Sequence, residues 1–274
     1  MRGAVRAFTI FLLTALFAAS ALADKKKGSW EGWHKFNLSI GAFFVNHNTA
    51  LRLDATDGSA GTRISWEDNL GLDDSQAVFR LDGTWRYKRR SSMQFSYFDL
   101  SRDTIAPVNI DIRWGDEFFA AGTTLQTQLD LKIFRGSWGY SFIQRPNWDV
   151  HATIGLYAMD IFAGLQDPST GAGDQGDVLA PLPVFGLGFV HKLRGKWILR
   201  GHAQFFAVTG DDYSGSLVDA LFGAVHNTFK NVGFGVGYNV MDLDVDSTDE
   251  DWTGRLDLDY KGVAAFINIR LRGK

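Results

Sequence analysis

The sequence predicts an all-β protein, an antiparallel transmembrane β-barrel of about 12 strands, with 10 or 14 strands as the alternatives. From Phe36 onward the dominant hydrophobic period is two, the period of a strand. The alternating runs are about 12 to 20 residues long, whereas soluble strands average about 5 to 6 and an outer-membrane crossing needs about 9 to 11. Aromatic residues end the apolar faces, as in the girdles of membrane barrels: Phe36, Trp85, Tyr87, Trp148, Trp197 and Tyr238.

In chain order the predicted strands cover residues 36–54, 62–70, 76–88, 92–103, 106–115, 122–143, 148–164, 178–193, 196–208, 217–229, 232–244 and 254–271. The patterns of 62–70 and of the segment after Pro107 are the weakest, which makes ten strands the first alternative. Long polar connections are predicted at 165–177, 209–216 and 244–253, and tight turns at 145–147, 194–196 and 230–231. Outer-membrane barrels place long loops outside and short turns in the periplasm, so both termini are predicted to be periplasmic.

Composition narrows the class of protein further. The 274 residues are 45% hydrophobic and 22% charged, and beyond residue 23 no apolar run approaches the roughly 20 residues of a membrane helix. A polytopic helical transporter is therefore excluded. The chain has no cysteine, which removes thiolate catalysis, cysteine zinc sites and cysteine-ligated iron–sulfur clusters.

The N-terminus predicts export. Residues 1–23 combine Arg2 and Arg6 with a short apolar stretch and the small-residue end Ala21-Leu22-Ala23, the pattern of a cleaved secretory signal peptide. Residues 24–35 then form a periplasmic leader, and residues 36–274 the barrel, which is placed in the cell outer membrane. Without the signal the chain has 26 basic and 31 acidic residues, a formal charge of −5 that disfavours nucleic acid as a partner.

Two strands change the parity of their apolar positions part-way, and each change predicts a β-bulge. In the first strand Asn46–Asn48 separates Ile40 and Phe44 from the later leucines, and near the middle of the chain the change falls at Phe134–Gly136. Glycines 233, 235 and 237 share one predicted lumen face, where they allow the wall to curve.

Charges of both signs on the predicted lumen faces form the first candidate site: Arg80, Asp82, Arg86, Asp130, Lys132, Asp149 and Arg200. Unpaired buried charges are costly, so these side chains are predicted to pair across the interior and plug it. The alternative is a charge ladder that guides ions or anionic solutes through an open bore. The interleaving of the two signs favours the plug.

The second candidate is an acidic loop that could bind calcium or magnesium loosely, bridging lipopolysaccharide phosphates: Asp242, Asp244, Asp246, Asp249, Glu250 and Asp251. It lacks the glycine hinge and the terminal glutamate of an EF-hand, so a solvated acidic loop is the favoured interpretation. A serine hydrolase site would need Ser141, His151 and Asp149 together at the periplasmic rim, but no oxyanion-hole signature accompanies them. No metal ligands, cofactor or catalytic residues are predicted.

The chain carries a series of short motifs: Arg52-Leu53-Asp54, Gly61-Thr62-Arg63-Ile64, Glu67 to Leu72, Arg80 to Gly83, Phe98 to Arg102, Asn231 to Gly233, Gly237 to Asn239 and Asp242 to Val245. Together they resemble those of a family of uncharacterised proteobacterial outer-membrane barrel proteins. The resemblance covers nearly the whole mature chain and supports fold and location, but it assigns no activity. The last strand ends on Leu271 and a basic tail, whereas outer-membrane barrels usually end on an aromatic residue read by the assembly machinery.

These patterns together predict a structural or interaction protein of the envelope with a largely plugged polar lumen, and no enzyme. A small-solute, porin-like channel is the alternative, and a lipid-modifying outer-membrane enzyme is the second alternative. The expected partners are outer-membrane lipid, lipopolysaccharide and the barrel assembly machinery.

Overall fold

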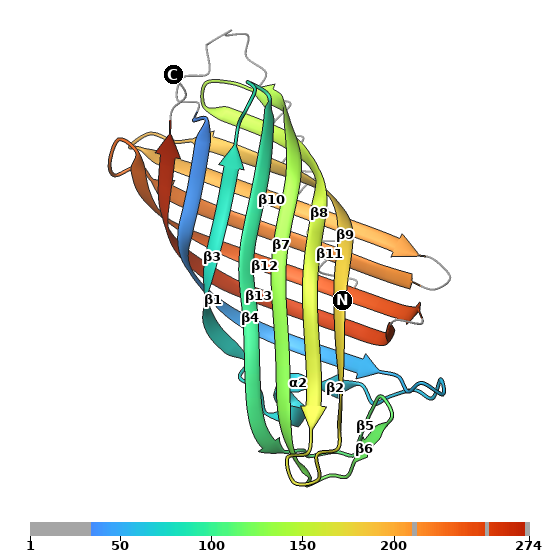
Figure 1. The fold of residues 1–274 in the computed structure, drawn as a ribbon. Helices are drawn as coiled ribbons and strands as arrows, with labels where there is room; N and C mark the ends of the chain where they lie inside the picture. The colour runs from blue at the N-terminus through green and yellow to red at the C-terminus, as the bar shows by residue number, and fades with distance from the viewer. Residues whose placement is uncertain (1–33, 210–212, 250–251, 272–274) are drawn as a thin grey trace, which may run out of the picture.

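The computed structural model describes residues 34–209, 213–249 and 252–271. Eleven strands form one antiparallel sheet in the order β13-β12-β11-β10-β9-β8-β7-β4-β3-β1-β2, and β1 also pairs with β13, which closes a barrel (Figure 1). Because β2 has only two residues, the barrel wall has ten strands. The wall strands are β1 (Phe36–Leu53), β3 (Ser75–Trp85), β4 (Ser91–Pro107), β7 (Thr124–Gln144), β8 (Trp148–Gln166), β9 (Gly173–Lys192), β10 (Trp197–Thr209), β11 (Tyr213–His226), β12 (Val232–Asp249) and β13 (Trp252–Leu271).

Two of the twelve predicted strands are not part of the wall. Residues 62–70 form β2 (Ile64–Ser65) and the short helix α2 (Trp66–Leu70). Ser65 caps this helix by accepting a hydrogen bond from the Asp68 amide, and Gly71 ends it with a left-handed φ of 75° that favours glycine. Residues 106–115 end β4 and form β5 (Ile112–Trp114), which pairs with β6 (Glu117–Phe119). The expected count of 12 was therefore wrong, and the alternative of ten matches the wall.

The predicted long connections are also mostly strand. β8 and β9 are joined by residues 167–172 alone, and β11 and β12 extend through much of 209–216 and 244–253. The long connections are instead 54–74, which contains α2, and 108–123, which contains β5 and β6. The predicted signal peptide 1–23 and the leader up to residue 33 lie outside the described residues.

The outside of the barrel changes character along its axis. We call the half that holds Phe36 and Leu271 the terminal half, and the other the distal half. The terminal half carries exposed apolar side chains, the belt: Phe44, Phe79, Trp85, Tyr87, Met93, Phe134, Trp138, Tyr140, Phe142, Ile154, Leu156, Phe185, Trp197, Phe205, Phe222, Phe234, Val236, Tyr238, Val263, Ile267 and Leu271. The belt covers nine residues of β7 (134–142) and of β13 (263–271), close to the length that crosses an outer membrane.

The inside changes in the opposite sense. In the terminal half the inward side chains are largely polar, whereas in the distal half they form one apolar cluster: Leu51, Ile64, Trp66, Leu70, Trp114, Leu125, Leu129, Leu131, Ile133, Met159, Ile161, Leu165, Leu182, Leu243, Val245, Leu256 and Leu258 among them. The distal exterior is polar, as in Gln126, Gln128 and Lys132 on β7. Where the surroundings change from hydrocarbon to water, apolar side chains therefore move from the outer face to the inner face.

This exchange explains the two parity changes, which are not bulges. β1 pairs with β13 in one unbroken register from Phe36 to Leu53, although Phe44 faces out and Leu51 faces in. In β7 the only register shift lies between Ser141 and Ile143, not at 134–136. The predicted bulges at both places were therefore wrong. The lumen position of glycines 233, 235 and 237 is confirmed, and the Phe266 ring lies over Gly235.

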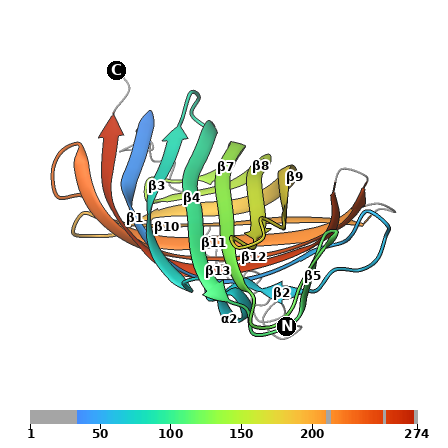
Figure 2. The ribbon, with the colours of Figure 1, turned by 60° about the horizontal axis from the view of Figure 1, so that its bottom comes forward.

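The distal end is covered by the segments that are not wall strands. α2, β2 and β5 lie together there (Figure 2), and Trp66 packs edge-on against Trp114 with ring centroids 5.8 Å apart. Both tryptophans are fully buried in the apolar cluster. Among the described residues no helix is long and apolar enough to cross a membrane.

Candidate functional site

The bore of the terminal half is crossed by a network of buried charges. Arg80 on β3 pairs with Asp82 at 3.0 Å (Nε to Oδ2) and donates to the Asn239 side chain on β12. The Arg80 guanidinium also lies 5.1 Å and 5.0 Å from the ring centroids of Phe43 and Phe98, within cation–π range. Arg80 is only 3% exposed, so its charge is held by protein groups rather than by water.

A second guanidinium joins this pair to the opposite wall. Arg135 on β7 lies 3.6 Å from Asp219 on β11 and 4.0 Å from Asp82, and its Nη1 also contacts the His202 ring on β10. Asp219 accepts further hydrogen bonds from the Tyr157 hydroxyl and the Asn239 amide. The network therefore links β3, β7, β8, β10, β11 and β12 through one continuous set of contacts.

A third guanidinium, that of Arg200 on β10, lies toward the terminal end of this network. Its Nη2 donates to the Ser39 hydroxyl on β1 at 3.0 Å, and the group lies 4.5 Å from the Phe266 ring centroid. Asn268 donates to the same hydroxyl at 2.9 Å. The structure places Arg80, Asp82 and Arg200, three of the predicted lumen charges, together on the inner side of the wall.

Two predicted members of the lumen network lie elsewhere. Asp130 and Lys132 are on the outer face of β7, where Asp130 accepts hydrogen bonds from Ser101 and Gln128. Lys132 lies 3.5 Å from Asp160, and both side chains are more than half exposed. The prediction that both residues face the lumen was therefore wrong. In the terminal half the polar side chains face inward, and the prediction assumed the same for the distal half, where the polar side chains face outward.

A separate cluster occupies the rim at the terminal end. Arg86 Nη1 donates to the Ser141 hydroxyl at 3.0 Å and to Asp149 at 3.1 Å. Ser141 Oγ and His151 Nδ1 each lie 3.1 Å from the same Asp149 oxygen, and Ser141 pairs with His151 in the ladder as the sequence predicts. A hydrolase triad needs the histidine to contact the nucleophile. Here the carboxylate lies between the two groups, an arrangement that suits a structural ion pair.

The acidic candidate site is part of a strand rather than a loop. Asp242, Asp244 and Asp246 lie on the outer face of β12, beyond the belt, and Arg255 on β13 binds Asp244 and Asp257 and lies 3.9 Å from Asp246. Glu250 and Asp251 lie outside the described residues, as does the side chain of Asp249. Within the described part of the chain no group of three or more acidic or histidine side chains is placed to hold a metal ion.

An ion pair that sequence analysis did not single out attaches α2 to the wall. Arg102 on β4 binds Glu67 at 2.5 Å and the Thr49 hydroxyl on β1 at 2.7 Å, and Glu67 also accepts from the Thr49 amide. His47 lies beside them, beyond the belt, with both ring nitrogens buried and unpartnered. Burial and the neighbouring Arg102 charge lower the pKa of His47 to about 4, so its ring is neutral at pH 7.

Arg135 and Asp219 were missed for different reasons. Arg135 falls in the segment interpreted as a bulge, and Asp219 is a single carboxylate within an otherwise apolar and small-residue strand. A continued alternation through β7 would have placed Arg135 on the lumen face. Glu67 and Arg102 are joined across 35 residues by the position of α2, which the strand pattern did not indicate.

The fold is that of a ten-stranded barrel with a membrane belt, and comparison with solved structures agrees. The outer-membrane protease OmpT from Escherichia coli matches with a TM-score of 0.55 at 11% identity, over 90% of this chain and 99% of that protein. OprG from Pseudomonas aeruginosa (TM-score 0.37, 10% identity, 88% and 97% coverage) and Ail of Yersinia pestis (0.35, 8%, 86% and 99%) are weaker matches that carry no argument.

The ten-stranded wall and the belt together define the class of the protein as a β-barrel of outer-membrane type. No protein-family model matches the chain, and no curated protein matches it. The similarity to OmpT, at 11% identity, shows the fold alone. Membership of the uncharacterised family therefore stays a prediction.

Proposed function

We propose that this protein is an outer-membrane barrel that does not conduct solutes along its axis and that acts in the envelope through its distal half, as a structural or interaction protein. The predicted signal peptide and the belt support the location. The observation that carries the proposal is the buried network across the bore. Arg80, Arg135 and Asp219 are 3%, 4% and 1% exposed, whereas the charges of a conducting pore stay in contact with water.

The distal half supplies the surface for interaction. About ten residues of β7 extend beyond the belt, which at a strand tilt near 40° projects the wall roughly 25 Å from the membrane. The exposed outer face there is largely hydrophilic, with carboxylates on β12 and β13 and the Lys132–Asp160 pair, although Ile105 and Leu179 are also exposed on it. Such a surface suits lipopolysaccharide head groups or another envelope protein as partners. We expect the barrel assembly machinery to bind the belt strands during insertion into the membrane.

Single-channel recording of the refolded mature chain in a planar bilayer tests the closed bore. We expect no current steps from the wild type or from K132A, whose altered side chain faces outward. The variant R80A/R135A removes two side chains that cross the bore and should give measurable steps if the folded barrel persists. Heat-modifiable migration in a gel verifies folding, and discrete steps from the folded wild type would overturn the proposal.

The rim cluster does not favour the enzyme alternative. The Ser141 hydroxyl accepts from Arg86 and donates to Asp149, so the carboxylate takes the place that the histidine base of a hydrolase triad would need. We therefore assign it no catalytic role. Any lipid or ester hydrolysis by the purified barrel that is lost in S141A would contradict this assignment.

A further inference from the structure

The barrel wall has a gap between β9 and β10 in the distal half. β10 pairs with β9 only from Phe185 to Lys192, and the preceding residues of β9, from Gly173 to Val184, pair with β8 alone. The last paired residues are Phe185 and Phe205. Beyond them the two strands diverge, and the edge of β9 has no partner among the described residues.

Two prolines keep this edge open. In an antiparallel strand, successive amides point alternately to the two neighbours. Lys192 donates toward the β8 side, to Asn147, and Leu193 donates toward the β10 side, to Trp197. The odd positions of β9 therefore face β10, and Pro181 and Pro183 occupy two of them. Because proline has no amide hydrogen, β10 cannot extend its ladder along this edge.

The wall has a second gap, between β3 and β4, but that gap is filled by α2, whereas the gap between β9 and β10 is not. β3 and β4 pair only up to Arg80 and Phe98, so β4 also has a free distal edge. α2 fills that space, and the Glu67–Arg102 ion pair holds it there. Among the described residues no strand pairs with this edge of β9, and no helix packs against it as α2 packs against β4.

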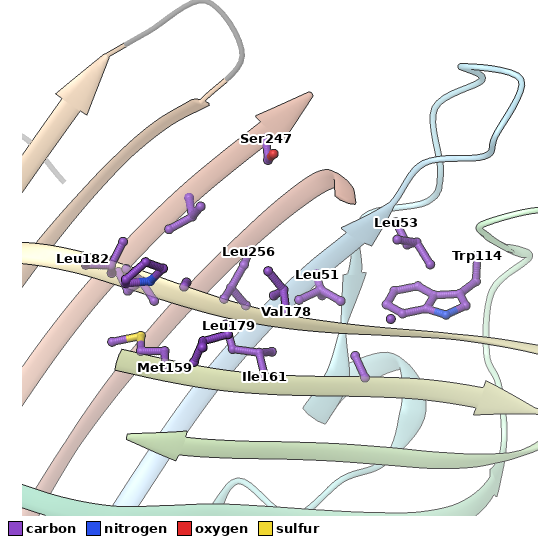
Figure 3. A pocket seen from close by; sticks show the side chains of 16 residues that line it. Leu51, Leu53, Trp114, Met159, Ile161, Val178, Leu179, Leu182, Ser247 and Leu256 are labelled. Atoms are coloured by element: carbon purple, nitrogen blue, oxygen red, sulfur yellow. The ribbon is translucent and has the colours of Figure 1, made fainter. Parts of the chain in front are cut away.

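Behind the open edge lies an apolar cavity of about 280 Å³. Its walls come from β1, β5, β8, β9, β12 and β13 (Figure 3). Apart from the Trp114 indole, Ser247 is the only lining residue with a polar side chain. The Trp114 indole closes one side and donates to the Asp174 carbonyl at the start of β9. Leu179 and Pro181 belong to the lining although their side chains lie on the outer face, so the cavity extends to the unpaired edge of β9.

The chemistry of these walls selects an uncharged hydrocarbon group. No charged side chain lines the cavity, so a charged ligand would lose its hydration without a partner. An apolar cavity of about 150 Å³ stays dry and binds benzene, and one of about twice that volume holds roughly a dozen carbon atoms. The gap lies at the distal margin of the belt, since Pro181 pairs with Ala158 and the next outward residue of β8 is the exposed Asp160.

We propose that the cavity is a binding site for one uncharged hydrocarbon group, which enters sideways between β9 and β10. The same chemistry is offered by an acyl chain of a membrane lipid and by a free small hydrocarbon. Both reach the margin of the belt directly. The site is independent of the closed bore, because it lies in the distal half and opens through the wall.

Gly176 offers a variant that fills the cavity. An added Cβ at this position meets only Leu53 Cδ1, at 4.0 Å, so a larger side chain points into space rather than into backbone. G176L should therefore fold and occupy the site. Q175L adds the same side chain to the exposed outer face of the same strand and is the matched control. A163F, which alters another wall residue, is a second filling variant.

Fluorine NMR of the full mature barrel in lipid nanodiscs tests binding with two probes. One arm adds 4-fluorobiphenyl, and the other uses lipids whose acyl chains end in fluorine. We expect a protein-bound resonance, distinct from that of the membrane-dissolved probe, in at least one arm; the arm that shows it identifies the source. Its affinity should fall at least tenfold in G176L and A163F and stay unchanged in Q175L. Absence of a bound resonance in both arms, or its survival in the filled variants, overturns the proposal.

Access through the gap is tested separately, because the chain has no native cysteine. The pair P183C/A207C lies across the gap, two residues beyond the last paired residues Phe185 and Phe205, and a short bifunctional thiol reagent joins it. The pair L187C/A203C lies in the ladder and is the control. We expect cross-linking to slow probe uptake at least tenfold for the first pair only. Equal uptake in the two cross-linked barrels would refute access between β9 and β10.

Discussion

Replacing Asp219 by alanine should destabilise the barrel more than any change at its surface. Asp219 is 1% exposed, forms an ion pair with Arg135 and accepts hydrogen bonds from Tyr157 and Asn239. D219A leaves the Arg135 guanidinium buried, with Asp82 at 4.0 Å as its remaining carboxylate. Removing one partner of a buried ion pair typically costs about 3–5 kcal/mol, and we expect a loss in that range in the free energy of unfolding.

The double variant R135A/D219A separates the ion pair from the loss of packing. Once Arg135 is gone, removal of Asp219 no longer strands a charge, so the double variant should lose less than the sum of the two single variants. For groups in direct contact the difference is expected to be about 1–3 kcal/mol. K132A is the matched surface control, since its pair with Asp160 is more than half exposed and should contribute about 1 kcal/mol or less.

The assay is urea-induced unfolding of the barrel in lipid vesicles, followed by tryptophan fluorescence and checked for reversibility. The slope of free energy against urea should stay constant across the variants if only stability changes. A D219A barrel within 1 kcal/mol of wild type, or fully additive losses in the double variant, would refute the view that these groups form a buried network.

Three further predictions concern the distal half. The pKa of His47 is lowered from 6.5 to about 4, so the folded barrel disfavours the protonated ring. The free energy of unfolding should therefore be highest above pH 6.5 and should fall as the pH is lowered toward 4. In H47L this fall should be smaller by up to about 3 kcal/mol, as measured by unfolding titrations at each pH. E67Q leaves Arg102 buried without a carboxylate, so hydrogen exchange in α2 should accelerate at least tenfold while that of β8 stays unchanged. In P181V/P183V the two restored amides allow β10 to extend its ladder, so both should be protected from exchange; free exchange of both would show that the prolines do not keep the edge open.

The sequence by itself determined the class of fold and the two faces of the strands in the terminal half. The alternation of Phe79, Leu81 and Trp85 with Arg80 and Asp82 is a local property, because lipid lies outside and a narrow polar lumen inside. The same reasoning located the Ser141–His151 pair and the short turns. Local periodicity is sufficient wherever the surroundings on each side of the wall stay constant.

Only the tertiary structure decided what happens where those surroundings change. The parity change at 134–136 has two explanations, a bulge or an exchange of lipid for water outside, and the residues alone do not distinguish them. The unbroken pairing of β7 with β8 through residues 134–136 shows that the apolar side chains change from the outer to the inner face there. It follows that Lys132 faces outward and Arg135 faces the lumen. The gap beside Pro181 likewise depends on where β10 leaves β9, because which neighbour an amide faces is a property of the assembled sheet rather than of the strand.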